Sequence, residues 1–396
     1  MEAARRLDVD LTVASEQPST FEQARSDALL TLDFRSPDVA ARQAREFASR
    51  HPVDAALGVD DDTVVLATAI NQTLGAATNP VGAALAARDK YLQRVTLAQH
   101  GVPVPQFSLH ALDEDMAPAA DRIPYPCVVK PLRWSASRGV MRADDPPGLA
   151  AAVSRLRAML EPLRVEGCDD AAMRFLVEEF VPGYEVALEG LLVEGRLVVL
   201  ALFDKPDPLQ GPFFEETIYV TPSRHPPGEQ AALTACAAAA AQALGLRHGP
   251  IHAELRWNVR GPWLIELAAR PIGGRCSAVL RFGDGDVSLE EIVARHALRM
   301  PLPSLERERC AAGVMMIPVP GAGTLRAVQG VDEARAVPGI VDVVIVVHRG
   351  QELVPWPEGS RYPGFIFARG ERPVDVERAL RAAHRGLTFV IDPLPG

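Results

Sequence analysis

The sequence predicts a mixed fold, with an α/β unit at the N-terminal end and an α+β region over the rest of the chain. In the first hundred residues helical and strand-like patterns alternate, which is typical of an α/β unit. From Pro124 onward, short apolar runs end in turn residues and predict mainly antiparallel strands. After Met300, the prolines of MPLPS mark a boundary before a last strand–helix unit.

We expect the N-terminal unit to cover residues 1–82. Its predicted elements are a helix in MEAARRLDV, a strand in DLTVAS, a helix over 39–50, a buried strand over 54–59 and a helix in VVLATAINQTLG. An open α/β unit of this kind normally begins with a buried strand and a glycine-bearing turn, and neither is present here. We therefore expect the first strand of this unit to be missing.

The middle region, residues 83–300, begins with a helix predicted over 83–100, which Gly101 and Pro103 end. Further helices are predicted at about 147–160 and 228–244, between the strands YPCVVKP, RFLVEEFVPG, EVALEGLLVEG, RLVVLALFD, ETIYVTPS, IHAELRW and WLIELAAR. In the last unit, residues 301–396, the helix ERPVDVERALRAAHR accompanies the strands GVMMIPV, GTLRAV, IVDVVIVV, GFIFARG and LTFVI.

Composition excludes several classes of protein. The 396 residues are 48% hydrophobic and 23% charged, which is enough to bury a sizeable core. The net charge of −10 gives no support to a nucleic-acid partner, because an acidic surface repels phosphates. No apolar run has the length of a membrane span, and no signal peptide is visible. The five scattered cysteines indicate reduced thiols in a cytoplasmic protein, with no disulfide framework or zinc site.

Two lysines and one short loop are candidates for phosphate binding. Lys130 ends the apolar run YPCVVK, and its point charge suits phosphate oxygens. Lys90 near a helix start is a weaker signal. In the loop SASRG, small residues at Ser135, Ser137 and Gly139 let backbone N–H groups converge on an anion. The alternatives are solvated lysines and a plain turn.

The segment FLVEEFVPG places two adjacent glutamates in one strand. Glu178 and Glu179 therefore point to opposite faces, and the one on the core side needs a partner. Backbone groups here could bind a purine edge. Glu185, two residues past Gly183, could bond ribose hydroxyls.

The run IHAELRWNVRGPWLIELAARPIGG predicts a β-hairpin. If its turn centres on Arg260, Glu254 faces Glu266 across the ladder, and such like charges destabilise a sheet unless a cation lies between them. Carboxylate oxygens suit magnesium that holds nucleotide phosphates. Arg270, on the same face as Glu266, could clamp a transferred phosphoryl group. The alternative is a structural salt bridge from Arg256 or Arg270 to these glutamates.

Substrate contacts are predicted around the loop DKPDPLQGPFFEETI, because Pro- and Gly-rich exposed loops often bind ligands. Its glutamates, Glu216 among them, could hold an amino group, while Arg275 or Arg270 holds a carboxylate. Gly273 and Gly274 leave room for a bulky amine. A solvated loop with packing phenylalanines is the alternative.

Taken in order, RDKYLQR, YPCVVKP, SASRGV, VEEFVPGYE, HAELRW and IELAARPIGG resemble the ATP-grasp superfamily, and more narrowly its L-amino-acid-ligase-like branch, from about Ala83 to the end of the chain. The resemblance implies an ATP-grasp fold with an N-terminal pre-ATP-grasp unit, a two-lobed ATP-grasp domain and a small C-terminal α+β unit.

The resemblance also implies roles for these residues. Lys90 and Lys130 would contact the nucleotide phosphates, under a mobile loop from Ser135 to Gly139. Magnesium, with manganese as an alternative, would bind Glu254 and Glu266. Arg270 would stabilise an acyl-phosphate. The adenine edge would meet the backbones of Glu179 and Val181 with Glu178 beside them, and Glu185 would hold the ribose.

The implied activity is ATP-dependent ligation of a small carboxylate to an amine through an acyl-phosphate, with release of ADP and phosphate. A homodimer is the default for the family. Many members have an asparagine where this chain has Ala268, which leaves the number of magnesium ions open. One alternative is a bicarbonate-activating carboxylase subunit, against which the C-terminal unit and the lack of a biotin-acceptor segment argue. The other is a non-catalytic nucleotide-binding protein, suggested by Ala268 and the missing strand.

Overall fold

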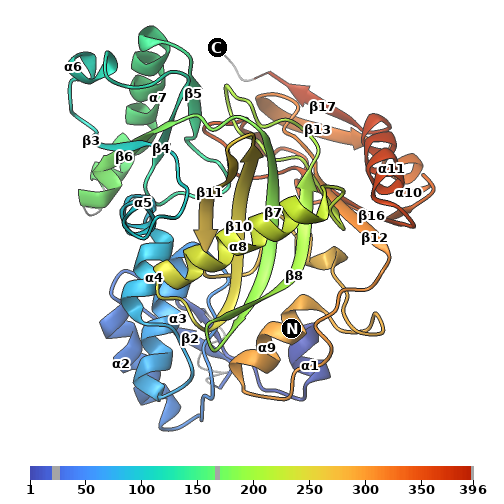
Figure 1. The fold of residues 1–396 in the computed structure, drawn as a ribbon. Helices are drawn as coiled ribbons and strands as arrows, with labels where there is room; N and C mark the ends of the chain where they lie inside the picture. The colour runs from blue at the N-terminus through green and yellow to red at the C-terminus, as the bar shows by residue number, and fades with distance from the viewer. Residues whose placement is uncertain (20–26, 166–169, 394–396) are drawn as a thin grey trace.

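The computed structural model describes residues 1–19, 27–165 and 170–393, and it confirms the mixed class of the fold. Strands of the described residues form sheets of two, four, three and eight strands, which helices cover (Figure 1). Cys168, which we predicted to be a reduced thiol, lies outside the described residues.

In its described residues, the N-terminal unit contains a small parallel sheet and several helices. Strand β1 (Val13–Ser15) pairs with β2 (Leu29–Thr31), followed by α2 (Pro37–Ala48) and α3 (Asp61–Leu74). Helix α1 (Glu2–Arg6) lies away from them, beside α9 (Figure 1).

The predicted strand over 54–59 is wrong. Its backbone is irregular, and Leu57 and Val59 are 50% and 76% exposed. The side chain of Asn71 bonds both the N–H of Ala56, at 2.7 Å, and its C=O, at 2.9 Å. The Asn71 side chain thus satisfies the backbone hydrogen bonds of Ala56 that we expected a neighbouring strand to satisfy. The apolar run alone did not reveal this partner.

The single helix predicted over 83–100 is also wrong, since it is divided into α4 (Val81–Arg88) and α5 (Lys90–Gln99). Asp89 leaves the helical conformation with ψ of 114°, and its carboxylate accepts the N–H groups of Tyr91 and Leu92. A capping aspartate therefore begins a new helix. This break places Lys90 at the first position of α5, where it is buried.

A four-stranded antiparallel sheet forms one lobe, in the order β3-β6-β4-β5. Helix α7 packs on it through Leu149, Leu156 and Leu160, which are almost fully buried. The elements of this lobe are β3 (Phe107–Ala111), α6 (Ala117–Ala120), β4 (Cys127–Pro131), β5 (Met141–Ala143), α7 (Pro146–Val165) and β6 (Arg174–Glu179).

The eight-stranded sheet is the centre of the molecule, in the order β11-β10-β7-β8-β9-β12-β16-β14. Helix α8 (Pro227–Ala243) crosses one face (Figure 1), and its buried alanines, such as Ala237 and Ala240, let it lie close to the strands. The strands are β7 (Tyr184–Val193), β8 (Arg196–Lys205), β9 (Ile218–Thr221), β10 (Gly249–Asn258), β11 (Gly261–Ala268), β12 (Ala311–Met316), β14 (Ile340–Ile345) and β16 (Gly364–Gly370).

Residues after 300 contribute β12, β14 and β16 to this central sheet. They also form a three-stranded sheet in the order β15-β13-β17. The remaining elements are α9 (Leu289–Ala297), β13 (Gly323–Gln329), α10 (Val331–Arg335), β15 (Glu352–Leu353), α11 (Pro373–Arg385) and β17 (Thr388–Asp392). Within the described ranges, no helix is long and apolar enough to cross a bilayer.

Candidate functional site

A cavity of about 300 Å³ lies between the four-stranded lobe and the central sheet. It is lined by all of the residues proposed above for phosphate, nucleotide, metal and substrate contacts except Gly139 and Arg275. Positions from Lys90 to Gly274 thus meet in one place, although they lie far apart in the sequence. Arg275 does not line it, because its guanidinium lies over the rings of Phe365 and Phe367.

The predicted hairpin forms from β10 and β11, and Glu254 is the direct partner of Glu266. The route to this pairing differs from our prediction. Asn258 pairs with Gly261, so the turn centres between Val259 and Arg260, and a bulge between Glu254 and Leu255 then restores the expected pair. The two glutamates are partly exposed, at 21% and 30% of their side chains.

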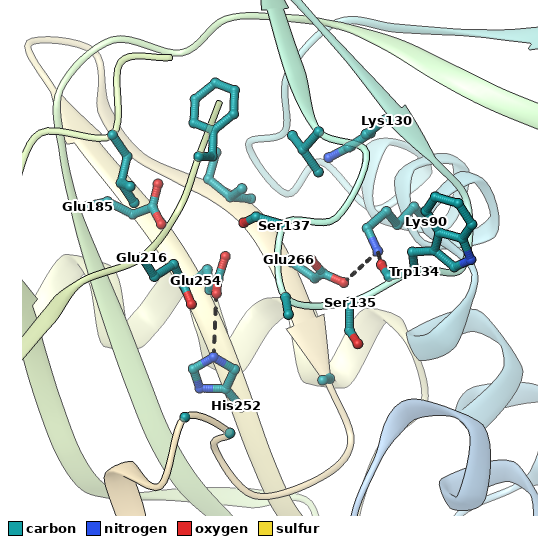
Figure 2. Close-up of a pocket in the computed structure, with 18 of the residues that line it drawn as sticks. Lys90, Lys130, Trp134, Ser135, Ser137, Glu185, Glu216, His252, Glu254 and Glu266 are labelled. Carbon is teal, nitrogen blue, oxygen red and sulfur yellow. Dashed lines mark hydrogen bonds and ion pairs between the residues drawn. The ribbon is translucent and has the colours of Figure 1, made fainter. Parts of the chain in front are cut away.

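Each of the two glutamates has a lysine partner. Lys90 Nζ lies 3.0 Å from Glu266 Oε1, and Lys205 Nζ lies 3.4 Å from Glu254 Oε1 (Figure 2 shows the first pair). The alternative of a salt bridge from an arginine to these glutamates is wrong, because each of them has a lysine as its ion-pair partner. Arg256 pairs with Glu185 at 2.7 Å instead, and Arg270 with a residue of the N-terminal unit.

We call the group of Lys90, Lys130, Arg94, Glu178 and Glu266 the basic end of the cavity. Here Glu178 is the core-side glutamate, as alternation predicted, and it accepts from Lys130 at 2.6 Å and Arg94 at 2.8 Å. Burial lowers the pKa of Lys130 to about 8, although Glu178 opposes the shift. Glu179, on the opposite face, pairs with Arg260 at 2.9 Å.

The loop Ser135–Gly139 closes over this end. Lys90 Nζ also donates to the carbonyl oxygen of Trp134, at 2.7 Å, just before the loop (Figure 2). Ala136, Ser137 and Gly139 all have positive φ, at 55°, 55° and 72°. Successive residues of this kind turn backbone N–H groups toward one side, as in anion-binding nests.

The segment between β6 and β7 carries a candidate backbone donor for a ligand. The N–H groups of Glu179 and Phe180 donate to the carbonyls of Gln106 and Pro126. The Val181 N–H, by contrast, has no acceptor among the residues that the structure describes, although Val181 is buried at the cavity wall. A buried N–H of this kind suits a ligand acceptor.

We call the group of Lys205, Arg256, Glu185, Glu216 and Glu254 the acidic end. Lys205 Nζ is buried among the three carboxylates, and it contacts Glu185 at 2.6 Å and also Glu216. One oxygen from each carboxylate lies within 4.8 Å of the others, so the three could also hold a metal ion. Burial raises the pKa of Glu216 to about 7, with Lys205 opposing and Glu254 adding to the shift.

Several residues of the cavity escaped sequence analysis. Asp61, at the start of α3, forms a two-pronged pair with Arg270 in which both distances are 2.8 Å. His252 lies 3.6 Å from Glu254 (Figure 2), and Tyr219 donates to Glu216. The predicted exposed loop DKPDPLQGPFFEETI is wrong at its second residue, Lys205, which ends the apolar strand β8 and is buried. Lys205 shares the sequence feature by which we selected Lys130, since each lysine follows an apolar run.

No disulfide joins the described cysteines, although Cys276 lines the cavity. Cys127, Cys236 and Cys276 are free and buried, and Cys310 is free and partly buried. Burial raises the pKa of the Cys127 thiol to about 12, which makes it a poor nucleophile.

Comparison with known proteins adds two domain matches. Residues 123–279 match the family model of the ATP-grasp domain, and residues 315–392 match that of L-amino acid ligase C-terminal domain 2. Among solved structures, the L-amino acid ligase from Bacillus licheniformis superposes with a TM-score of 0.79 at 25% identity, over 99% of this chain and 95% of that one.

Two curated relatives are similar over part of their length. Human carnosine synthase 1 is 28% identical over 328 residues, which are 78% of this chain and 39% of that protein. Dapdiamide A synthase of Enterobacter agglomerans is 29% identical over 229 residues, which are 57% of this chain and 52% of that protein. This chain therefore spans only two fifths to about half of these relatives.

Proposed function

Because the chain belongs to the ATP-grasp superfamily, with the C-terminal domain of L-amino acid ligases, we propose that it is an ATP-dependent carboxylate–amine ligase. In this proposal a small carboxylate, such as that of an amino acid, is activated as an acyl-phosphate and joined to an amine, with release of ADP and phosphate. The observation that carries it is the pairing of Glu254 with Glu266 between two lysines on one cavity wall.

We assign the phosphates of the nucleotide to the basic end. Lys90 and Lys130 would neutralise the phosphates beneath the loop Ser135–Gly139. Val181, with its free N–H, would meet the adenine edge together with the backbone of Glu179. Glu185 would hold the ribose, because Lys205 and Arg256 orient its carboxylate and leave lone pairs for hydroxyl donors.

Magnesium fits Glu254 and Glu266 better than the three carboxylates of the acidic end. Both glutamates are partly open to the cavity, whereas Glu185 is buried against Lys205 and Arg256. Ala268 is buried and offers no ligand atom. Bound magnesium, or manganese, would neutralise charge on the transferring phosphoryl group.

The chain's own residues would position and shield the reaction. The substrate carboxylate attacks the γ-phosphorus and displaces ADP, while Lys90 and Lys130 hold the phosphates. The amine nitrogen then attacks the acyl carbon, and phosphate leaves. Arg270 would hold the developing negative charge, since Asp61 fixes its guanidinium in the cavity. Closure of the loop would exclude water from the acyl-phosphate.

Substrate recognition is proposed at the acidic end. Glu216 would hold an amino group of the acid or amine substrate. Gly273 and Gly274 line the cavity and leave it wide at this point. A substrate carboxylate would bind Arg270, because Arg275 lies against Phe365 and Phe367 instead.

A panel assay tests the proposal. Phosphate release with Mg·ATP is measured across amino-acid pairs and single carboxylates, and the amide is identified by mass spectrometry. We expect amine-dependent release of ADP and phosphate, with loss of product in Glu266→Ala. ATP binding without turnover across the panel would instead favour a non-catalytic protein, and bicarbonate-dependent turnover would favour a carboxylase.

We also propose three broader properties. Residues 1–82, 83–300 and 301–396 would act as the pre-ATP-grasp, ATP-grasp and C-terminal units. The enzyme would work in the cytoplasm on small molecules, without nucleic acid or membrane. It would form a homodimer, which light scattering after size-exclusion chromatography tests.

A further inference from the structure

The loop Ser135–Gly139 has a backbone conformation that needs outside support. Ala136 and Ser137 both have φ of 55°. Residues with a Cβ avoid this left-handed region because of steric conflict with the backbone. Such conformations persist where surrounding contacts impose them. For this loop, three of those contacts come from one segment of the C-terminal unit, Trp356–Glu358, which we call the latch segment.

The latch segment makes three hydrogen bonds with the loop. Trp356 Nε1 donates to the carbonyl oxygen of Ala136 at 2.8 Å. The N–H of Gly139 donates to the carbonyl oxygen of Pro357 at 2.9 Å. Arg138 Nε donates to the carbonyl oxygen of Glu358 at 3.1 Å. The loop is therefore held by residues about 220 positions away in the sequence.

The latch segment is itself fixed to the same lobe. The carboxylate of Glu358 forms a two-pronged pair with Arg155 of α7, at 2.6 and 2.8 Å. Helix α7 packs on β4 and β5, the strands that flank the loop. The latch segment thus binds both the loop and the helix behind it, so it can hold the loop at a set position relative to the lobe.

The ring of Trp356 also contacts a residue of the cavity wall, Tyr362. The two ring centroids are 4.8 Å apart, and Trp356 is 4% exposed. Tyr362 lines the cavity near the acidic end, where burial and the charge of Glu216 raise the pKa of its hydroxyl well above the usual value. A single indole therefore contacts the loop at the basic end and a cavity wall at the acidic end.

We propose that Trp356 is a positioning residue that couples closure of the loop Ser135–Gly139 over the nucleotide phosphates to occupancy of the substrate side through Tyr362. The inference rests on the proposed ligase function. Trp356 touches no reacting atom and acts through the Ala136 carbonyl and the Tyr362 ring. A loop held in this way keeps water away from the acyl-phosphate while the amine arrives.

The first test compares Trp356→Phe with Trp263→Phe. Both changes remove an indole donor, but Trp263 lies on β11 outside the cavity lining and bonds Asn258. For Trp356→Phe we expect the KM for ATP to rise about tenfold while kcat changes less than about threefold. We also expect phosphate release to exceed amide formation, because water reaches the acyl-phosphate. The proposal would be overturned if the two variants had the same KM for ATP and the same ratio of phosphate released to amide formed.

The second test needs no ligase activity. Trypsin cleavage after Arg138 is followed with and without Mg²⁺ and the analogue AMP-PNP. We expect the nucleotide to protect this bond in the wild type and in Trp263→Phe, and to protect it far less in Trp356→Phe and in Glu358→Gln. If the chain binds nucleotide but makes no amide, this difference persists and only the ligase proposal fails. Equal protection in all four proteins would contradict the role of Trp356.

Discussion

The two ends of the cavity use the same kinds of charged side chain in opposite proportion. At the basic end, three cationic side chains face two carboxylates: Lys90, Lys130 and Arg94 against Glu178 and Glu266. At the acidic end, two cationic side chains face three carboxylates: Lys205 and Arg256 against Glu185, Glu216 and Glu254. The first arrangement suits a polyanion such as a nucleotide, and the second suits a cation such as an ammonium group.

The same contrast appears in the two buried lysines. Burial lowers the pKa of Lys130 to about 8, because one carboxylate, Glu178, offsets only part of the desolvation. Burial also opposes the charge on Lys205, but its surrounding carboxylates outweigh that effect and hold its pKa well above the usual value. Lys130 therefore shares a single carboxylate, that of Glu178, with Arg94, whereas Lys205 lies among three carboxylates.

The largest expected effect is on stability, in Lys205→Met. Removal of the Lys205 ammonium, which contacts all three carboxylates, leaves buried charges uncompensated, which costs about 3–5 kcal/mol. Urea denaturation followed by circular dichroism measures the free energy of unfolding. Lys130→Met is the matched control, because Arg94 still pairs with Glu178 there and the loss should be smaller. Equal losses of unfolding free energy in the two variants would mean that Lys130 and Lys205 contribute equally to stability, and the contrast between the two ends would fail.

A tenfold effect on turnover is expected for Asp61→Asn. The carboxylate of Asp61 aligns both prongs of the Arg270 guanidinium, and a neutral amide accepts only one of them. We expect kcat to fall about tenfold with an unchanged KM for ATP, since the basic end is untouched. Asp62→Asn is the control, because the neighbouring Asp62 is exposed and bonds Arg88. If both variants behave alike, Asp61 does not position Arg270.

The pH dependence of nucleotide binding follows from Lys130. With its pKa lowered from 10.5 to about 8, Lys130 loses its proton as the pH rises through 8, so nucleotide affinity should fall above that pH. Between pH 7 and pH 9 we expect kcat/KM for ATP to fall about tenfold. Lys130→Arg, which stays charged, should flatten this profile. A wild-type profile that is flat to pH 9 would contradict the assignment of Lys130 to the phosphates.

Local sequence patterns predicted those features of the site that depend on a single strand or a single hairpin. The opposite faces of Glu178 and Glu179 follow from the alternation of a strand, and both were confirmed by their partners. The Glu254–Glu266 pair was also predicted, although the bulge that produces it was not. A bulge leaves little trace in a pattern of apolar residues, because it shifts the register by a single position.

Contacts between distant segments could not be predicted in this way. Asp61 and Arg270 lie 209 positions apart, and nothing in the periodicity near either residue names the other. Helix propensity likewise favoured one helix through Asp89, where a side-chain cap divides it. The position of Lys205 at the end of an apolar run is visible in the sequence, as for Lys130. Its three carboxylates are not, because they come from β7, from β10 and from the segment before β9.

The smallest expected effect concerns the two glycines at the acidic end. Gly274 has φ of +58°, and a Cβ added there would lie 2.4 Å from Sδ of Met316. Gly274→Ala should therefore cost about 1–2 kcal/mol of unfolding free energy, from backbone strain and displacement of the methionine. A Cβ added at Gly273 would meet nothing within 4 Å, so Gly273→Ala should change stability by less than about 0.5 kcal/mol.

The two variants also separate packing from substrate recognition. Gly273→Ala narrows the cavity without disturbing the fold, so it should raise the KM for bulky amines while leaving the KM for ATP unchanged, because the basic end is intact. Gly274→Ala should lower the melting temperature as well. Differential scanning fluorimetry and kinetics with amines of increasing size measure both effects. If Gly273→Ala does not change the preference among amines, the amine binds away from this wall, and the acidic end holds the substrate only through its charges.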